Sequence, residues 1–316
     1  MRSYSLIASA KINLYLEIIK DRPDDYHDLV MVLQSINLAD RVDLRPLKND
    51  TICLHCNHPE VPQDHRNLAY KAAALMAQKF PDAFAKYGGV DITIDKRIPV
   101  GAGLAGGSTN AAAVLVGLNL MWNLRLSISQ LQYLGSLLGS DVPFCIVGGT
   151  MLATGRGEYL TRLPVIDSFY AVLAKYRSLS VSTAWAYQTF RHQYLSSHAL
   201  DTVAVVGCKQ RTYSEQMVSA ITRHNKKQIC QFLHNDLERV VLPKYPQVQK
   251  LRDEFQRLGC SVMMSGSGPT MFALTKSQQE AQQVVEAVKM AIPDPDLDLW
   301  ISKFTDTSIR VESFSE

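Results

Sequence analysis

The stretch "PVGAGLAGGSTNAAAVLVGLN", residues 99–119, decides the fold. Four glycines fall within the seven residues from Gly101 to Gly107, and a run of Ala, Leu and Val follows Asn110. Glycine has no Cβ, so backbone N–H groups in such a loop can approach another group closely. The apolar run has the composition of a buried helix. We therefore expect a glycine loop that leads into a core helix.

The loop formally matches the dinucleotide-binding pattern G-x-G-x-x-G at Gly101, Gly103 and Gly106. That pattern also requires an acidic residue about 20 positions later, which holds the ribose 2′-hydroxyl. The 45 residues from Lys96 to Ser140 contain no Asp or Glu, so a dinucleotide oxidoreductase is disfavoured. The phosphate loop G-x-x-x-x-G-K-[ST] does not fit either, because no Lys follows the glycines.

The missing acids instead favour an anion at this helix N-terminus. The N–H groups of Gly106, Gly107 and Ser108 would lie unpaired at the positive end of the helix dipole. The hydroxyls of Ser108 and Thr109 could contact a phosphate oxygen or a magnesium ion. A tight glycine turn capped by Ser108 is the simpler alternative, but four glycines exceed what a cap requires. We expect phosphate binding.

Two charged side chains in apolar surroundings complete a candidate site. Lys11 and Asn13 share one face of the first predicted strand, "ASAKINLYLEI", where a lysine needs an anionic partner or a ligand. Asp141, in "LGSDVPF", precedes Pro143, which biases Val142 toward an extended conformation and places Asp141 at a helix end or in a turn. Asp141 could simply cap that turn. Beside a phosphate loop, however, Lys11 and Asp141 form a kinase pair in which Asp accepts a hydroxyl proton and Lys holds charge.

Composition describes an ordinary soluble globular protein of 316 residues, 47% hydrophobic and 20% charged. The net charge of +3 is too small to indicate nucleic acid or an anionic membrane as a partner. No apolar stretch approaches the roughly 20 residues that span a bilayer, and the N-terminus lacks a signal-peptide pattern. We therefore predict a cytoplasmic protein, either a monomer or a weak homodimer.

The six cysteines are dispersed, as is typical of free thiols in a reducing compartment. One cluster, Cys53, His55, Cys56 and His58, brings four soft ligands together. A zinc site normally needs a second ligand pair at a set distance, and none is evident. We expect a strand followed by a loop here, and no metal site.

Strands and helices alternate along the chain, which predicts an α+β protein in two halves. Predicted strands cover 4–19, 31–45, 51–56, 90–97, 169–176, 260–275 and 297–304. Predicted helices cover 67–80, 108–122, 128–139, 183–194, 214–223, 246–258 and 277–291. Glycine turns and a change of texture near Pro164 indicate a boundary between an N-terminal domain, 1–163, and a C-terminal domain, 164–316.

Several motifs resemble those of the GHMP kinases. "PVGAGLAGGSTNAA" resembles their phosphate loop P-x-G-x-G-L-[GA]-G-G-S-[SA], and "LGSDVPF" and "MSGSGPTMFAL" are similar to two further motifs. "AKINLYL" and "RPDDYHDL" resemble the members that act on a cytidylated methylerythritol, and "NDLE" also recurs in the family. The resemblance extends from Ala10 to Leu274. Ala102 and Ala105 stand where the loop can carry glycine, a mild change if their φ angles are negative.

The resemblance implies a two-domain GHMP kinase fold. Its N-terminal ATP domain would be ribosomal-protein-S5-like, and its C-terminal domain a ferredoxin-like α/β sandwich. It implies ATP-dependent phosphorylation, with Mg²⁺, of the 2-hydroxyl of diphosphocytidyl-methylerythritol, in the non-mevalonate (MEP) pathway to isoprenoid and terpenoid precursors. The alternatives are another GHMP small-molecule kinase, of the mevalonate or homoserine type, or a non-catalytic GHMP-type sensor. The intact Lys11 and Asp141 argue against a sensor.

The resemblance also assigns roles residue by residue. Lys11 and Asp141 match the catalytic pair. Positions that match nucleotide contacts are Asn67, Lys96, Pro99, Gly101, Gly103, Leu104, Gly106, Gly107, Ser108 and Thr109. Positions that match substrate contacts are Asn13, Tyr26, His27, Thr183 and Tyr187. Among these, Tyr26 would stack on cytosine, His27 would hydrogen-bond the base edge, and Tyr187 would be the second aromatic. The resemblance places the third motif, from Gly266 to Thr270, against the phosphate loop; a plain hairpin turn is the alternative.

Overall fold

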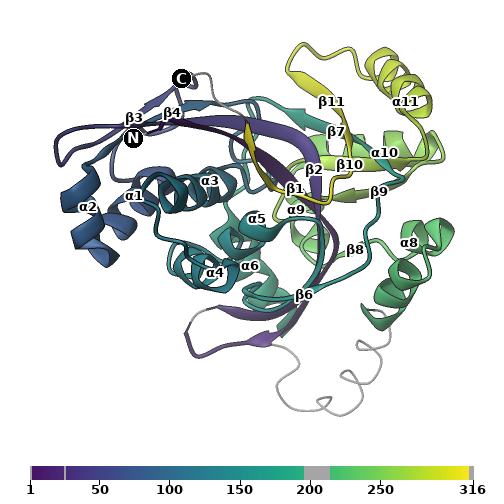
Figure 1. The fold of residues 1–316 in the computed structure, drawn as a ribbon. Helices are drawn as coiled ribbons and strands as arrows, with labels where there is room; N and C mark the ends of the chain where they lie inside the picture. The colour runs from purple at the N-terminus through teal and green to yellow at the C-terminus, as the bar shows by residue number, and fades with distance from the viewer. Residues whose placement is uncertain (1, 25, 196–213, 313–316) are drawn as a thin grey trace.

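The computed structural model describes residues 2–24, 26–195 and 214–312, which form two β-sheets with helices packed against them (Figure 1). The larger sheet has eight strands, and its main path runs in the order β12-β1-β2-β4-β3. Its strands are β1 (Tyr4–Asp21), β2 (His27–Pro46), β3 (Ile52–Cys56), β4 (Val90–Asp95), β5 (Thr150–Gly155), β6 (Tyr159–Arg162), β8 (His234–Asn235) and β12 (Ile309–Glu312). The α+β fold class is confirmed.

The long strand β1 contributes to two hydrophobic cores. Its even-numbered residue Leu6 packs in the first core, Ile12 in the second, and Leu16 in the first again. Side chains alternate along a strand, so such exchanges require breaks in register. The pairing of β1 with β2 shifts between Ser9 and Ala10 and between Asn13 and Tyr15. Between these two shifts, the odd-numbered positions face the cavity described below.

Helices cover the larger sheet. They are α1 (Leu68–Lys79), α2 (Pro81–Tyr87), α3 (Gly106–Met121), α4 (Ile128–Ser136) and α5 (Val142–Val147). Helix α3 is buried along most of its length, as the apolar run predicted. Gly117 lets it approach the sheet, because a Cβ there would lie 2.2 Å from Leu44 Cδ1. The predicted helices 67–80, 108–122 and 128–139 are thus confirmed to within a few residues.

The smaller sheet has the order β11-β7-β10-β9. Its strands are β7 (Tyr170–Tyr176), β9 (Ser261–Met264), β10 (Met271–Thr275) and β11 (Leu297–Lys303). The strand pattern expected over 260–275 divides into β9 and β10, because the Gly-Ser-Gly-Pro segment forms a hairpin turn between the two strands. Helices α10 (Pro246–Arg257) and α11 (Gln278–Ala291) pack near this sheet, at the opposite end of the molecule from α1 and α2 (Figure 1).

Shorter elements connect the two sheets. They are α6 (Thr183–Phe190), the π-helical turn η1 (Arg191–Leu195), a helix at 214–222, α8 (Lys226–Gln231) and α9 (Glu238–Lys244). Strands β8 and β12, from the second half of the sequence, both pair with β1. The predicted domain division at 163/164 falls between β6 and β7 and stays a prediction.

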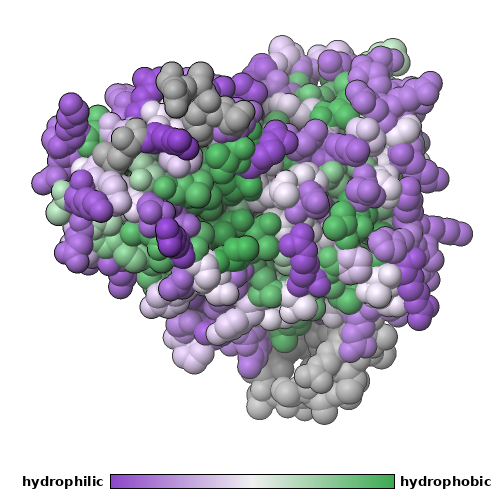
Figure 2. All heavy atoms as spheres, in the orientation of Figure 1, coloured by the Kyte–Doolittle hydropathy of each residue, from purple (hydrophilic) through white to green (hydrophobic). Residues whose placement is uncertain are grey.

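The surface is largely hydrophilic, with apolar side chains gathered over the region of α3 to α5 (Figure 2). Leu120, Ile128 and Leu137 are the large aliphatic side chains of this region that are exposed, Ile128 by 61%. Within the described ranges, no helix is long and apolar enough to cross a membrane.

Candidate active site

A cavity of about 860 Å³ brings together almost all of the residues that the sequence singled out. Its lining includes the following predicted residues: Lys11, Asn13, Tyr26, His27, Asn67, Lys96, Pro99, Gly101, Gly103, Leu104, Gly106, Gly107, Ser108, Asp141, Thr183 and Tyr187. Thr109 is not among the lining residues. It is fully buried, and its hydroxyl donates a hydrogen bond to the Ser9 carbonyl at 2.9 Å. The Thr109 hydroxyl therefore makes a packing contact with β1, and its contact with a nucleotide stays a prediction.

The glycine loop is fixed between β1 and the turn that connects β9 to β10. The Lys11 N–H donates to the Leu104 carbonyl at 3.1 Å. On the other side, the Ser265 hydroxyl donates to the Gly103 carbonyl at 3.0 Å. Gly103 has φ of +72°, and a Cβ there would lie 2.1 Å from the Ser265 carbonyl oxygen. The expected contact between the third motif and the phosphate loop is confirmed.

Ala105 departs from the mild change expected of it. Its φ is +59°, in the left-handed region, where a Cβ costs roughly 1–2 kcal/mol. Ala105 immediately precedes α3, whose first residues are Gly106, Gly107 and Ser108. The first turn of α3 contains no acidic side chain. Its N–H groups have no partner within the helix, which makes this end of α3 suited to an anion.

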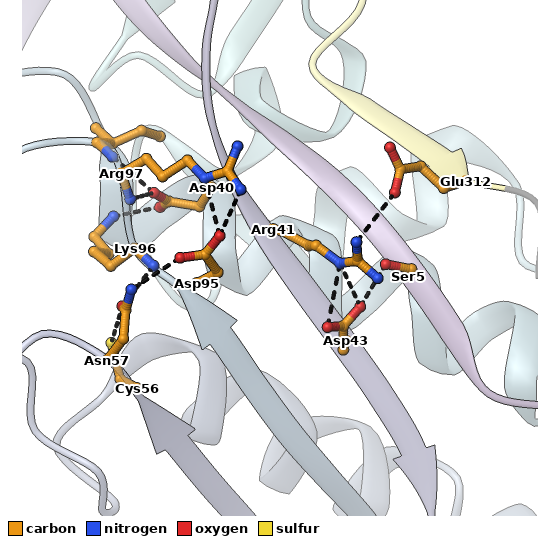
Figure 3. Close-up of polar contacts among 11 residues, drawn as sticks. Ser5, Asp40, Arg41, Asp43, Cys56, Asn57, Asp95, Lys96, Arg97 and Glu312 are labelled. Carbon is orange, nitrogen blue, oxygen red and sulfur yellow. Dashed lines mark hydrogen bonds and ion pairs between the residues drawn. The ribbon is translucent and has the colours of Figure 1, made fainter.

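A buried ionic network supports the same helix end (Figure 3). The Asp40 carboxylate, on β2, is fully buried and pairs with Lys96 Nζ. It also accepts hydrogen bonds from the Arg97 N–H at 2.7 Å and from Asn110 Nδ2 at 2.8 Å. A Cβ on Gly106 would lie 2.6 Å from Lys96 Nζ. The Lys96 ammonium thus lies against the first residue of α3 while it is paired with Asp40.

Asp40 is a site residue that the sequence reasoning missed. It lies on a predicted strand whose same-face neighbours, Leu38 and Val42, are apolar, and a carboxylate buried on such a face must be paired. That rule led us to Lys11 on β1, and it would have found Asp40 on β2 as well.

The predicted pair, Lys11 and Asp141, comes together at the cavity. Lys11 is 4% exposed, and its Nζ donates to Asn13 Oδ1 at 2.8 Å and lies 3.6 Å from Asp141 Oδ2. Asp141 is the residue before α5, so its predicted place at a helix end is confirmed. The extended conformation expected for Val142 is wrong, because Val142 begins α5. Pro143 follows in the first helical turn, where its missing N–H costs nothing.

Aromatic side chains line another part of the cavity. The rings of His27 and Tyr187 lie with their centroids 5.2 Å apart at an interplanar angle of 33°. The Tyr26 ring is 49% exposed and has the Arg156 guanidinium 4.8 Å from its centroid, a cation–π distance. Burial lowers the pKa of His27, although the Asp21 carboxylate acts in the opposite direction. Burial raises the pKa of Tyr187.

Arg156 is a second cavity residue that the sequence reasoning missed. It lies between two glycines with φ of +70° and +108°, Gly155 and Gly157, and its Nε donates to Glu158 Oε1 at 3.2 Å. A charged residue between two glycines in "TGRGE" was the signal available in the sequence.

Two predicted residues use their side chains within the protein as well. Asn67 caps α1 through its Oδ1, and its Nδ2 donates to the Pro62 carbonyl at 2.8 Å. The Thr183 hydroxyl lies 2.8 Å from the Ser267 hydroxyl and so connects α6 to the third motif. Both residues still line the cavity.

The histidine and cysteine cluster forms a strand, as expected. Cys53, His55 and Cys56 lie on β3, and His55 Nε2 is 3.2 Å from Asp91 Oδ1. Both cysteines are free thiols. Over the described ranges, no three His, Cys, Asp or Glu side chains are grouped so that they could hold a metal ion.

Comparison with known proteins identifies the family to which the chain belongs. Residues 67–149 match the model of the GHMP kinases N terminal domain, and residues 217–293 match that of the GHMP kinases C terminal domain. A homoserine kinase structure from Cytophaga hutchinsonii has the same fold, with a TM-score of 0.73 at 19% identity over 99% of this chain and 98% of its own.

Higher sequence identity is found with proteins that share one name. The 4-diphosphocytidyl-2-C-methyl-D-erythritol kinase of Trichormus variabilis is 59% identical over 98% of this chain and 99% of its own. The Acaryochloris marina protein of the same name is 54% identical over 99% of this chain and 100% of its own. The crystal structure of a 4-(cytidine 5′-diphospho)-2C-methyl-D-erythritol kinase is 30% identical, with a TM-score of 0.71 over 95% of this chain and 98% of its own. The chain therefore belongs to the GHMP kinases and, within them, to the family of 4-diphosphocytidyl-2-C-methyl-D-erythritol kinases.

Proposed function

We propose that the chain transfers the γ-phosphoryl group of ATP to the 2-hydroxyl of 4-diphosphocytidyl-2-C-methyl-D-erythritol, which yields the 2-phosphate and ADP in the MEP pathway. The observation that carries the proposal is the pairing of Lys11 and Asp141, at 3.6 Å, in a cavity that also holds a phosphate loop and an aromatic cluster. One cavity thus offers groups suited to binding a triphosphate, to transferring a proton and to binding a nucleobase.

Asp141 is the residue proposed to accept or orient the proton of the acceptor hydroxyl. Its side chain is 33% exposed, so it can reach a substrate in the cavity. Lys11, which is buried and hydrogen-bonded to Asn13, lies beside Asp141 and offsets the negative charge that develops during transfer. Catalysis of phosphoryl transfer consists mainly of such positioning and charge stabilisation.

The first turn of α3 and Lys96 are proposed to hold the triphosphate. The N–H groups of Gly106, Gly107 and Ser108 would bind phosphate oxygens, with Lys96 beside them. The hydroxyl oxygen of Ser108 suits Mg²⁺, which is commonly bound by few protein oxygens together with phosphates and water. When bound, Mg²⁺ neutralises charge on the phosphates.

The aromatic cluster is proposed to hold the cytosine. Tyr26 would stack on the base, with Tyr187 as the second aromatic, and stacking contributes roughly 1–3 kcal/mol per base whatever the base is. Selection of cytosine must therefore come from the ring edge, to which His27 is proposed to hydrogen-bond. Thr183, on the same helix as Tyr187, completes the proposed substrate side.

The cytoplasmic location and the monomeric or weakly dimeric state remain proposals of the sequence. The described helices include none able to span a membrane, and the small net charge of +3 is in keeping with a small-molecule substrate.

A panel of acceptors tests the proposal. The purified protein with Mg-ATP is given 4-diphosphocytidyl-2-C-methyl-D-erythritol, mevalonate, homoserine, galactose or no acceptor, and ADP release is measured. We expect turnover with the cytidylated acceptor alone. Turnover with another acceptor would support the assignment as a kinase and contradict the assignment of the aromatic cluster to cytosine. ATP binding without turnover on any acceptor would favour the sensor.

A further inference from the structure

The Asp21 carboxylate contacts the His27 ring but does not line the cavity. Asp21 ends β1 and is the direct cross-strand partner of His27 at the start of β2. His27 Nε2 lies 3.2 Å from Asp21 Oδ1, and both atoms are buried. Neither atom has a hydrogen-bond partner among the residues that the structure describes, so the two lie within reach of each other without an aligned hydrogen bond. A small rotation of either side chain would let a proton on Nε2 bond to Asp21 Oδ1 and satisfy both atoms at once.

This proton determines what the other ring nitrogen can do. A neutral imidazole carries one N–H, so a proton on Nε2 leaves Nδ1 with a lone pair and makes it an acceptor. His27 lines the cavity, and its Nδ1 is not among the buried unpartnered atoms of the described chain. Nδ1 is therefore the nitrogen that remains available to a ligand.

A second contact holds Asp21 in place. Arg191 Nε lies 2.8 Å from Asp21 Oδ2. Arg191 belongs to η1, which continues directly from the helix that carries Tyr187. The Tyr187 ring in turn contacts the His27 ring. Asp21 is thus fixed from the side of α6 by an ion pair with a guanidinium.

We propose that Asp21 is a positioning residue that fixes His27 as the Nε2–H tautomer and so presents Nδ1 as an acceptor for the exocyclic amino group of cytosine. Uracil has a carbonyl oxygen at that position, and two acceptors facing each other leave both unpaired. The inference rests on the proposed function, because it assumes that a cytidylated acceptor enters this cavity. Asp21 lies just before the "RPDDYH" motif and has no role assigned by the resemblance.

Discrimination between two acceptors tests the proposal. The ratio of kcat/KM for the cytidylated acceptor to kcat/KM for its uridylated analogue is measured in the unmodified protein, in Asp21→Ala and in Asp28→Ala. Asp28 is a matched control, because it belongs to the same hairpin, pairs with Arg22 and Lys20, and does not line the cavity. We expect a ratio of at least about 100 in the unmodified protein, since the site is built to accept a hydrogen bond.

Asp21→Ala is expected to lower this ratio about tenfold, as for the loss of one hydrogen bond. We expect the change to come from a higher KM for the cytidylated acceptor, with kcat nearly unchanged. Asp28→Ala is expected to leave the ratio within about twofold. An equal rise of both KM values in Asp21→Ala would overturn the proposal, because it would mean a merely structural role. Failure of the unmodified protein to use the cytidylated acceptor would instead reject the proposed function.

The tautomer can be read without any turnover. Nitrogen chemical shifts of the histidine rings, with His27 assigned from a His27→Gln variant, distinguish a protonated from an unprotonated ring nitrogen. We expect a protonated Nε2 and an unprotonated Nδ1 in the unmodified protein, and a mixture in Asp21→Ala. A protonated Nδ1 with an unprotonated Nε2 in the unmodified protein would overturn the proposal.

Discussion

At the scale of single residues, His27 carries the chemistry that distinguishes one base from another. It is 7% exposed and faces three side chains from other elements: Asp21 on β1, Tyr187 on α6 and Arg191 on η1. Burial lowers its pKa most, Asp21 raises it, and Arg191 lowers it further. The net result is a pKa below the ordinary value of 6.5, so His27 is neutral at neutral pH.

This pKa predicts how substrate binding depends on pH. We expect KM for the cytidylated acceptor to stay constant from about pH 8 down to about pH 6.5, and to rise below the lowered pKa. The rise follows because protonation gives Nδ1 a hydrogen and turns it from an acceptor into a donor. The measurement is KM as a function of pH at saturating Mg-ATP.

The same protonation has a definite sign for stability. Between the lowered pKa of folded His27 and 6.5, the unfolded chain binds more protons at this histidine than the folded chain does. The contribution of His27 to the free energy of unfolding is therefore lost as the pH falls through that window.

A His27→Gln variant serves as the control for the KM measurement, since its KM is expected to lack this pH dependence. A KM that rises toward alkaline pH in the unmodified protein would contradict the account.

Neighbouring residues show how far a sequence specifies a side chain's role. Ser108 and Thr109 are adjacent hydroxyl residues, and the sequence predicted a nucleotide contact for both. Consecutive helix residues point about 100° apart, so one can line the cavity while the other packs on β1. The rotation of α3 about its axis decides which of the two side chains lines the cavity. This rotation follows from tertiary packing and could not be predicted from the sequence pattern.

At the scale of elements, β1 illustrates the same limit. Its strand character and the shared face of Lys11 and Asn13 could be predicted from alternation, and their 2.8 Å contact is confirmed. The two register shifts that direct this face into the cavity have no glycine or proline to mark them. They arise where one strand serves two cores, and that depends on elements far along the sequence.

The contact between the glycine loop and the third motif also belongs to this scale, and it predicts the effect of Gly103→Ala. The new Cβ would lie 2.1 Å from a backbone oxygen of Ser265, and φ is +72°, so the two segments must separate. We expect a loss of stability of roughly 2–4 kcal/mol together with at least a tenfold weaker affinity for ATP. Urea unfolding and calorimetric titration with ATP measure both.

Gly101→Ala is the matched control for this variant. Gly101 has a similar φ of +60°, but its Cβ would meet only the Ser180 side chain, at 3.2 Å. It therefore carries the backbone strain without the clash, and we expect a loss of only about 1–2 kcal/mol. Equal effects of the two variants would mean that the contact with Ser265 contributes nothing.

At the scale of the whole molecule, the cavity draws its residues from both halves of the chain. Lys11, Lys96 and Asp141 come from the first half, and Tyr187 and Ser267 from the second. The sequence predicted most of this set because the motifs that carry the chemistry are short and locally recognisable. It missed Asp40 and Arg156, whose importance lies in contacts with residues distant in the sequence, Lys96 and Tyr26, and it did not predict the return of β8 and β12 to β1.

The central claim is that the pairing of Lys11 with Asp141 makes this cavity a phosphotransferase site, and Asp141→Asn tests it most directly. Turnover with 4-diphosphocytidyl-2-C-methyl-D-erythritol and affinity for ATP are measured in the same preparation. Glu60→Gln serves as the control, since it removes another cavity carboxylate that has no ion pair with Lys11 in the described structure. We predict that Asp141→Asn lowers kcat by about 10²–10⁴ while ATP binds within about threefold of its normal affinity. A loss of ATP affinity as large as the loss of kcat would contradict the account.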